Sequence, residues 1–251
     1  DAEGPLYFLA WTTTPWTIPS DQAVSLKPGA AYVAVEHDGR AEVMLEDLAP
    51  KCCEEFGWEY TPVMVDGKPY VVPAETFHHI HYKQPIFDGV EGVALLADYV
   101  GVDDGTGIVH NSPGHGVDDY FACLKEGITD ICMPVDDDGK FYTGEEFGTG
   151  GPFSGMDTDE ANPHIIEFLR ERGTLVLEKK ITHSYPHCWR CKHPVLFRAK
   201  RSARTSSGIR PTRPTASAPW SSSVPTGASA VSATGACLSP ATLAPTAARR
   251  S

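Results

Sequence analysis

Residues 11–19 read Trp-Thr-Thr-Thr-Pro-Trp-Thr-Ile-Pro. The apolar, β-prone residues 6–13 lead into this stretch, so we expect a strand that ends at the three threonines. Pro15 and Pro19 favour an extended or turning backbone and argue against a helix. The stretch therefore offers hydroxyls and backbone N–H groups at a strand end, although a threonine-rich strand before a proline turn accounts for the same letters.

A second stretch, residues 105–120, reads Gly-Thr-Gly-Ile-Val-His-Asn-Ser-Pro-Gly-His-Gly-Val-Asp-Asp-Tyr. It predicts a strand ending at His110, a Gly/Pro loop, and a helix that opens with Asp118 and Asp119. Such junctions gather polar groups at one sheet edge, and glycine lets a substrate approach the backbone closely. A capped helix beside an internally bonded strand histidine explains the stretch equally well.

Around these two stretches, residues 1–199 have the pattern of a strand-rich α+β unit. Residues 32–37 alternate as a strand does. Hairpin turns are indicated by three Asp-Gly pairs: Asp38-Gly39, Asp66-Gly67 and Asp138-Gly139. Short helices are predicted over residues 46–56, 118–126 and 159–172.

Charge and hydropathy exclude two classes of partner. All 33 acidic residues precede Lys200, so the folded part is strongly acidic and lacks the clustered Lys and Arg of a DNA-binding protein. No apolar run approaches the roughly 20 residues of a membrane span. Any RNA must therefore be held by a local patch or by another domain.

Cysteine usage and the N-terminus bear on location. Seven cysteines, with Cys52 and Cys53 adjacent, form a poor disulfide framework and favour a reducing cytoplasm. The chain begins with Asp1 and shows no signal peptide, so we expect it to start inside a longer protein.

Residues 200–251 change character abruptly. Ser, Ala, Thr, Pro and Arg dominate, Trp220 is the only aromatic residue, and no apolar period is visible. This composition predicts a disordered tail, because it buries too little surface to offset chain entropy. A shifted reading frame in a GC-rich gene and a natural low-complexity tail both account for it. Sequencing the encoding DNA distinguishes them.

Together, the stretches at residues 11–19 and 105–120 resemble the editing-domain signature of isoleucyl-tRNA synthetases, in the same order and with similar separation. The valyl and leucyl relatives instead carry Arg-Pro-acidic-Thr after the paired threonines, so Thr14-Pro15-Trp16-Thr17 favours the isoleucyl branch. Residues 183–192, His-Ser-Tyr-Pro-His-Cys-Trp-Arg-Cys-Lys, are similar to the stretch where that family's chain leaves the editing domain. The resemblance covers residues 1–199.

The resemblance implies a β-barrel-like editing domain over residues 1–182 and an exit segment over residues 183–199. It also implies hydrolysis of valine wrongly attached to the 3′-terminal adenosine of tRNA(Ile), with no cofactor required. The catalytic candidates that it implies are Thr12, Thr13, Thr14 and Asp119. The threonines would line the pocket for the adenosine and the attacking water, and Asp119 would hold the α-ammonium group.

The substrate-binding candidates on the same resemblance are Trp11, Asp21, His110 and His115. Trp11 would be a wall of the pocket, and His110 would lie beside the amino acid's side chain and help to exclude isoleucine. The family usually has Asn where this chain has Asp21. An ionised carboxylate cannot donate the hydrogen bond that an amide donates, so Asp21 would weaken binding if it contacts the RNA.

Metal binding is predicted only at half a site. Cys188-x2-Cys191 supplies two of the four ligands of a structural zinc, and the family's second cysteine pair is absent from this chain. Cys237 stands alone in the tail and cannot replace it. His78, His79 and His81 form another cluster, but no acidic or Cys partner is evident nearby, so we interpret them as ordinary surface or core histidines.

Three functional hypotheses remain open. The parent enzyme uses ATP, but this chain lacks the family's His-Ile-Gly-His and Lys-Met-Ser-Lys-Ser signatures, so it should not activate isoleucine. The first hypothesis is a hydrolase that acts on Val-tRNA(Ile). The second is a catalytically silent fragment that binds aminoacyl-adenosine or RNA ends, and the third is a misfolded product without activity.

Overall fold

The strand pattern of residues 32–37 forms the centre of a hairpin. In the computed structural model, which describes residues 5–182, 185–192, 194–199, 230–235 and 238–241, β3 (Ala31–His37) pairs antiparallel with β4 (Arg40–Leu45). Asp38 and Gly39 both have positive φ, 48° and 75°, as a tight two-residue hairpin turn requires. The first predicted Asp-Gly turn is therefore confirmed.

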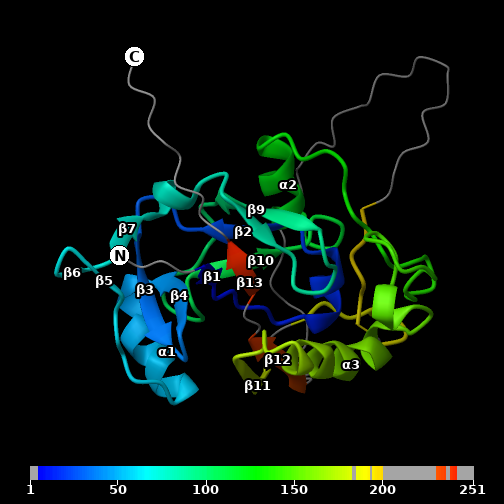
Figure 1. The fold of residues 1–251 in the computed structure, drawn as a ribbon. Coiled ribbons are helices and arrows are strands. Elements are labelled where there is room, and N and C mark those ends of the chain that lie inside the picture. Colours follow the sequence, from blue (N-terminus) through cyan, green and yellow to red (C-terminus); the bar gives the residue numbers. More distant parts are fainter. Residues whose placement is uncertain (1–4, 183–184, 193, 200–229, 236–237, 242–251) are drawn as a thin grey trace.

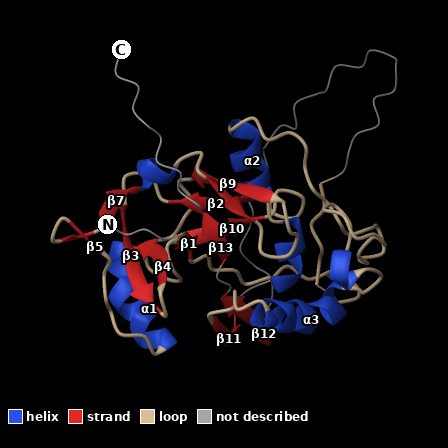
Figure 2. Ribbon diagram, viewed as in Figure 1, coloured by secondary structure: helices blue, strands red, loops and turns tan. Residues whose placement is uncertain are grey.

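Two sheets carry the fold (Figures 1 and 2). The first has the order β13-β1-β4-β3-β7 and adds β1 (Leu6–Phe8), β7 (Val71–Pro73) and β13 (Leu238–Ala241) to the hairpin. The second has the order β10-β2-β9-β8, with β2 (Ala23–Leu26), β8 (His81–Lys83), β9 (Glu91–Leu96) and β10 (Ile108–Asn111). Two ribbons complete the strands: β5 (Met64–Val65) with β6 (Lys68–Pro69), and β11 (Leu177–Thr182) with β12 (Ala230–Gly235).

The helices are short and stand where the sequence predicts them. They are α1 (Ala49–Phe56), α2 (Val117–Lys125) and α3 (Thr158–Glu171), and η2 (Glu46–Leu48) precedes α1 directly. The Asp157 side chain caps α3 by accepting from the Glu160 N–H, and the helix buries Ile165 and Leu169 in the core. Figure 1 shows α2 over the sheet of β9 and α3 on the opposite side of the molecule.

Two expectations need correction. The α+β class is confirmed, but neither sheet closes on itself among the described strands, so the barrel-like expectation is wrong as a closed barrel. Residues 15–20, where the prolines argue against a helix, form the 3₁₀ helix η1 (Pro15–Ser20). Pro15 fits because the first helical N–H groups have no intrahelical partner in any case. Two further 3₁₀ turns are η3 (Ala74–Phe77) and η4 (Gly151–Phe153).

The predicted tail is only partly described. Residues 200–229, 236–237 and 242–251 lie outside the described residues, and so does Cys237. The two short segments that are described, β12 and β13, pair with β11 and β1 as strands, which differs from the expectation of no regular structure. The boundaries at residues 182 and 199 stay predictions. Within the described ranges, no helix combines the length and apolarity that crossing a bilayer requires.

Candidate active site

The threonine stretch (residues 11–19) and the Gly/Pro stretch (residues 105–120) lie side by side. Trp11 forms a parallel bridge with Val109, and its N–H donates to the Ile108 carbonyl at 2.9 Å. Beyond the threonines, η1 turns back under the end of β10, where the Thr17 hydroxyl lies 3.1 Å from His110 Nε2. Two segments far apart in sequence therefore build one polar centre.

The three threonines differ in what occupies their hydroxyls. Thr12 is buried, and its Oγ1 accepts from the Thr14 N–H at 3.1 Å, so it holds the turn. Thr13 and Thr14 are half-buried, and their hydroxyl oxygens lie 3.4 Å apart. Of these three residues, Thr13 and Thr14 therefore have the hydroxyls that are accessible to a bound ester or a water molecule.

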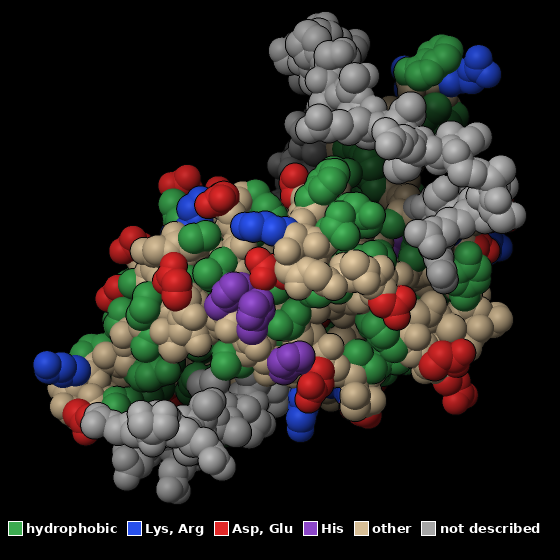
Figure 3. All heavy atoms as spheres, turned by 90° about the horizontal axis from the view of Figure 1, so that it is seen from above, with side chains coloured by type: hydrophobic (Ala, Val, Ile, Leu, Met, Phe, Trp, Pro, Cys, Tyr) green, Lys and Arg blue, Asp and Glu red, His purple; other side chains and the backbone are tan. Residues whose placement is uncertain are grey.

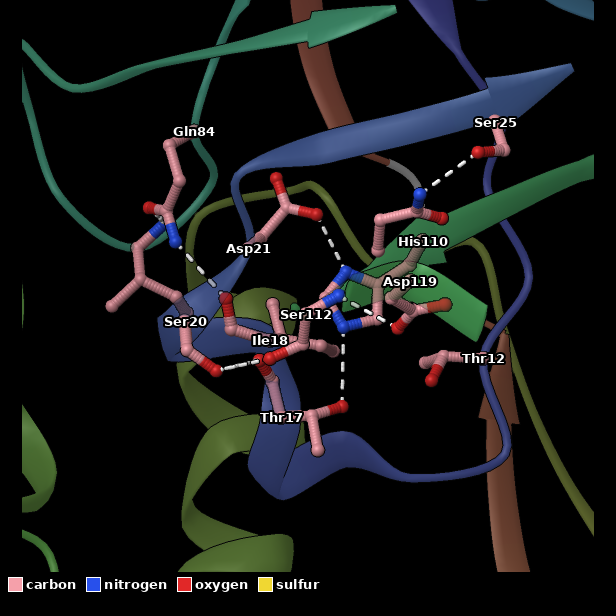
Figure 4. A network of polar contacts seen from close by, with 12 residues as sticks. Thr12, Thr17, Ile18, Ser20, Asp21, Ser25, Gln84, His110, Ser112 and Asp119 are labelled. Atoms are coloured by element: carbon pink, nitrogen blue, oxygen red, sulfur yellow. Dashed lines mark hydrogen bonds and ion pairs between the residues drawn. The ribbon is translucent and has the colours of Figure 1, made fainter. Parts of the chain in front are cut away.

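Asp119 lies in the first turn of α2, close to His110. Its Oδ2 accepts from the Ser112 N–H at 2.9 Å, and its Oδ1 accepts from the Tyr99 hydroxyl at 3.3 Å. Burial raises the pKa of the Asp119 carboxyl, while the Ser112 bond and the charge of His110 oppose that rise. In Figure 4, Asp119 and Thr12 lie on one side of the His110 imidazole and Asp21 on the other.

The backbone at the start of α2 is fitted to this carboxylate. A Cβ added at Gly116 would come within 2.4 Å of Asp119 Oδ2. Glycine is therefore needed at this position for Asp119 to keep its place against the Ser112 N–H. Gly116 therefore leaves room for the carboxylate as well as forming part of the turn.

Asp21 does not face the solvent. The side chain is 0% exposed, its Oδ1 lies 2.5 Å from His110 Nδ1, and its Oδ2 accepts from the Tyr82 hydroxyl. Burial raises the pKa of Asp21, and the hydrogen bonds and charge of His110 and Tyr82 oppose that rise. Both carboxyl oxygens are thus engaged inside the protein, and one of them orients His110, while direct contact of Asp21 with the substrate stays a prediction.

The sequence pattern does not single out several residues of this network. Ser20 and Ser112 join η1 to the Gly/Pro loop through hydroxyls 2.5 Å apart, and Asn111 donates to Ser25 at 2.8 Å. Thr17 and Ser112 lie inside the two stretches quoted above, so the sequence could have indicated that they belong to the site. Tyr82 on β8 carries no such signal, since an isolated tyrosine in a strand indicates only packing.

His115 belongs to the packing around this centre. It is 8% exposed, its ring meets Trp16 edge-on at a centroid distance of 4.7 Å, and its Nδ1 lies 2.9 Å from the Phe197 carbonyl. Its Nε2 is buried and has no hydrogen-bond partner among the described residues. Burial, before any other cause, lowers the pKa of His115 to about 4. The structure thus places this candidate against the exit segment.

The His115 site predicts an acid-sensitive contribution to stability. Its folded pKa of about 4 lies below the ordinary 6.5, so between these values the unfolded chain binds a proton that the folded chain does not, and stability falls as pH falls. At pH 5 the loss is about 2 kcal/mol relative to pH 7.5. We expect His115→Gln to remove this part of the pH dependence. Urea unfolding of both proteins at the two pH values measures it, and equal pH dependence would contradict it.

The cysteine pair remains half a site. Cys188 is half-buried, Cys191 is exposed, and both are free thiols in a tight turn closed by the Lys192 N–H donating to the Cys188 carbonyl at 2.9 Å. Among the described residues, the one group of three or more potential metal ligands is His78, His79 and Glu126. That group also corrects the expectation that the histidine cluster has no acidic partner.

Comparisons with known proteins agree with the family resemblance that the two stretches indicate. No family model matches the chain. The chain is 44% identical over 193 residues to the isoleucine–tRNA ligase of Nitratidesulfovibrio vulgaris (strain DSM 19637 / Miyazaki F), which covers 77% of this chain and 19% of that protein. It is 43% identical over 191 residues to the isoleucine–tRNA ligase of Acholeplasma laidlawii (strain PG-8A), covering 76% and 20%. The chain therefore spans about one fifth of the length of the curated relatives it matches.

A solved structure supports the fold alone. "The crystal structure of GlLeuRS-CP1" is similar with a TM-score of 0.51 and 15% sequence identity, covering 67% of this chain and 81% of that chain. The mixed arrangement of sheets and few helices is thus shared with a known domain at low sequence identity.

Proposed function

Since this chain belongs to the isoleucine–tRNA ligase family over the 77% of its length that matches, we propose that it is the proofreading part of such an enzyme and hydrolyses valine from misacylated tRNA(Ile). Water attacks the ester carbonyl, the bond to the ribose oxygen breaks, and that oxygen takes up a proton. The products are free valine and tRNA with an intact 3′ end. An aminoacyl ester is already activated, so this reaction needs no covalent nucleophile.

One observation carries the proposal: the threonine stretch contacts His110, and the Asp119 carboxylate lies beside it. Asp119 binds the α-ammonium group through a charge-assisted hydrogen bond. Thr13 and Thr14 hold the adenosine and the attacking water. His110, fixed by Asp21 and Thr17, borders the side-chain pocket and excludes isoleucine. Trp11 forms a wall.

The test is a deacylation assay with purified chain and tRNA(Ile) carrying either valine or isoleucine. We expect release of valine above the buffer rate and at least about tenfold faster than release of isoleucine, because a pocket too small for the extra methylene of isoleucine makes overpacking cost about 1–3 kcal/mol. Cooperative thermal unfolding of the same sample establishes that it is folded. If a folded chain releases neither amino acid above the buffer rate, the proposal is wrong. The hypothesis of a catalytically silent fragment that binds aminoacyl-adenosine or RNA ends then remains. ATP-dependent activation of isoleucine is not expected.

A further inference from the structure

We propose that His78, His79 and Glu126 form a binding site for one divalent transition-metal ion of the zinc class. His78 and His79 directly follow η3, and Glu126 directly follows α2, so the cluster joins two elements distant in sequence. The proposed proofreading reaction uses none of these residues. The site is also separate from the Cys188–Cys191 half-site, which shares no ligand with it.

The spacing of the ligand atoms suits a small ion. Glu126 Oε2 lies 3.0 Å from His79 Nε2 and 3.4 Å from His78 Nε2, and all three ligand atoms lie within 4.8 Å of one another. Zinc bonds of about 2.0–2.2 Å in a tetrahedron place neighbouring ligand atoms about 3.3 Å apart. Only small side-chain adjustments are therefore needed to close three ligands on one ion.

The backbone brings the two histidines to the same side. Successive side chains of an extended chain point to opposite faces, so neighbouring histidines would ordinarily diverge. His79 instead has φ of +64°, a left-handed conformation that costs a residue other than glycine roughly 1 kcal/mol or more. The two imidazole rings consequently lie 3.8 Å apart between centroids, inclined by 31°. The His79 N–H, which donates to the Ala94 carbonyl at 2.8 Å, ties this turn to β9.

An unsatisfied nitrogen points to a missing partner. His78 Nε2 is buried, and no described group makes a hydrogen bond to it, although Glu126 Oε2 is 3.4 Å away in a poor orientation. Buried polar atoms of native proteins nearly always have a partner. A metal ion between the two histidines and the carboxylate would satisfy this nitrogen.

The donor set selects the kind of ion. Two imidazoles and one carboxylate suit Zn²⁺, Co²⁺ or Ni²⁺, whereas Mg²⁺ and Ca²⁺ prefer oxygen ligands alone. Three protein ligands leave a fourth position for water. The His79 side chain is 60% exposed, so an ion can enter from solvent. Figure 3 shows histidine side chains at the surface on the face seen from above, with acidic side chains next to them.

Zinc binding to the chain without a polyhistidine tag tests the site, in a Cys188→Ser/Cys191→Ser background that removes the two thiols of the half-site. Equilibrium dialysis is expected to give one Zn²⁺ per chain, and zinc is expected to raise the thermal unfolding midpoint. Bound Co²⁺ should show visible absorption without the thiolate charge-transfer band. His79→Asn, which tolerates the left-handed backbone, and Glu126→Gln should each weaken zinc binding at least tenfold.

His81→Ala is the matched control, because His81 lies on the same segment but pairs with Glu91 at 3.6 Å, outside the cluster. It should bind zinc as the background protein does. Thermal unfolding without metal shows that each variant is folded. Failure of the background protein to bind zinc, or unchanged binding in both cluster variants, overturns the site. Neither outcome affects the proofreading proposal, which the deacylation assay tests separately.

Discussion

Replacing Asp119 with alanine is expected to slow valine release from misacylated tRNA(Ile) by roughly 30-fold or more. Removing one member of a desolvated charge pair costs about 2–5 kcal/mol, much of it from the unpaired partner that is left behind. Here the partner is the α-ammonium group, and the half-buried carboxylate lies beside His110, where the amino acid would sit. Initial rates at limiting substrate measure the effect.

Two companion variants separate charge from structure in this experiment. Asp119 also accepts the Ser112 N–H, so alanine removes a backbone contact together with the charge. Asp119→Asn keeps an acceptor for that N–H and removes only the charge, so it should lose most of the activity while unfolding like the parent. Asp118→Ala removes the same charge from an exposed neighbour in the same helical turn and should leave the rate unchanged. Full activity in Asp119→Asn would show that the charge of the Asp119 carboxylate is not needed to bind the α-ammonium group.

The sequence could indicate the candidate site because its polar residues are concentrated in two short stretches. Each stretch has a strand, a break and a run of polar residues. These local signals predict the end of β10 to within one residue, whereas β1 ends at Phe8, before the threonines where the sequence predicts its end. The contact between Thr17 and His110 follows from those ends meeting at one edge. Motif resemblance, not periodicity, indicated that the two belong together, because no local property of residues 11–19 encodes pairing with residues 105–120.

What the sequence could not show are partners fixed only by tertiary packing. Tyr82 reaches Asp21 from β8, and Glu126 reaches His79 from the end of α2. Hydrophobic periodicity defines faces of elements but not the angle at which elements cross. The open sheets have the same cause, since sheet closure depends on strand tilt and register rather than on the residue pattern of a single strand.

Replacing Asp21 with alanine is expected to destabilise the folded chain by about 3–5 kcal/mol, because it breaks a fully buried polar network and leaves its partners unsatisfied. His110 Nδ1 and the Tyr82 hydroxyl would both lose their partner where water does not reach. Urea unfolding of the parent and the variant at neutral pH measures the difference. A loss below about 1 kcal/mol would mean that the network relaxes or admits water.

Asparagine at the same position should behave differently, with a cost of about 1 kcal/mol or less. The amide oxygen can accept from the Tyr82 hydroxyl, and the amide nitrogen can donate to His110 Nδ1 once the imidazole carries its proton on Nε2. That tautomer donates to the Thr17 hydroxyl, so every member of the network keeps a partner. Asp21→Asn is thus the matched control for Asp21→Ala.

Tyr82→Phe completes the comparison. Combined with Asp21→Ala, it should cost clearly less than the sum of the two single changes, since both remove members of one hydrogen-bonded unit. Additive losses would show that Tyr82 and Asp21 contribute independently. In that case Asp21 would hold His110 alone, and the short contact with Tyr82 would add no stability of its own.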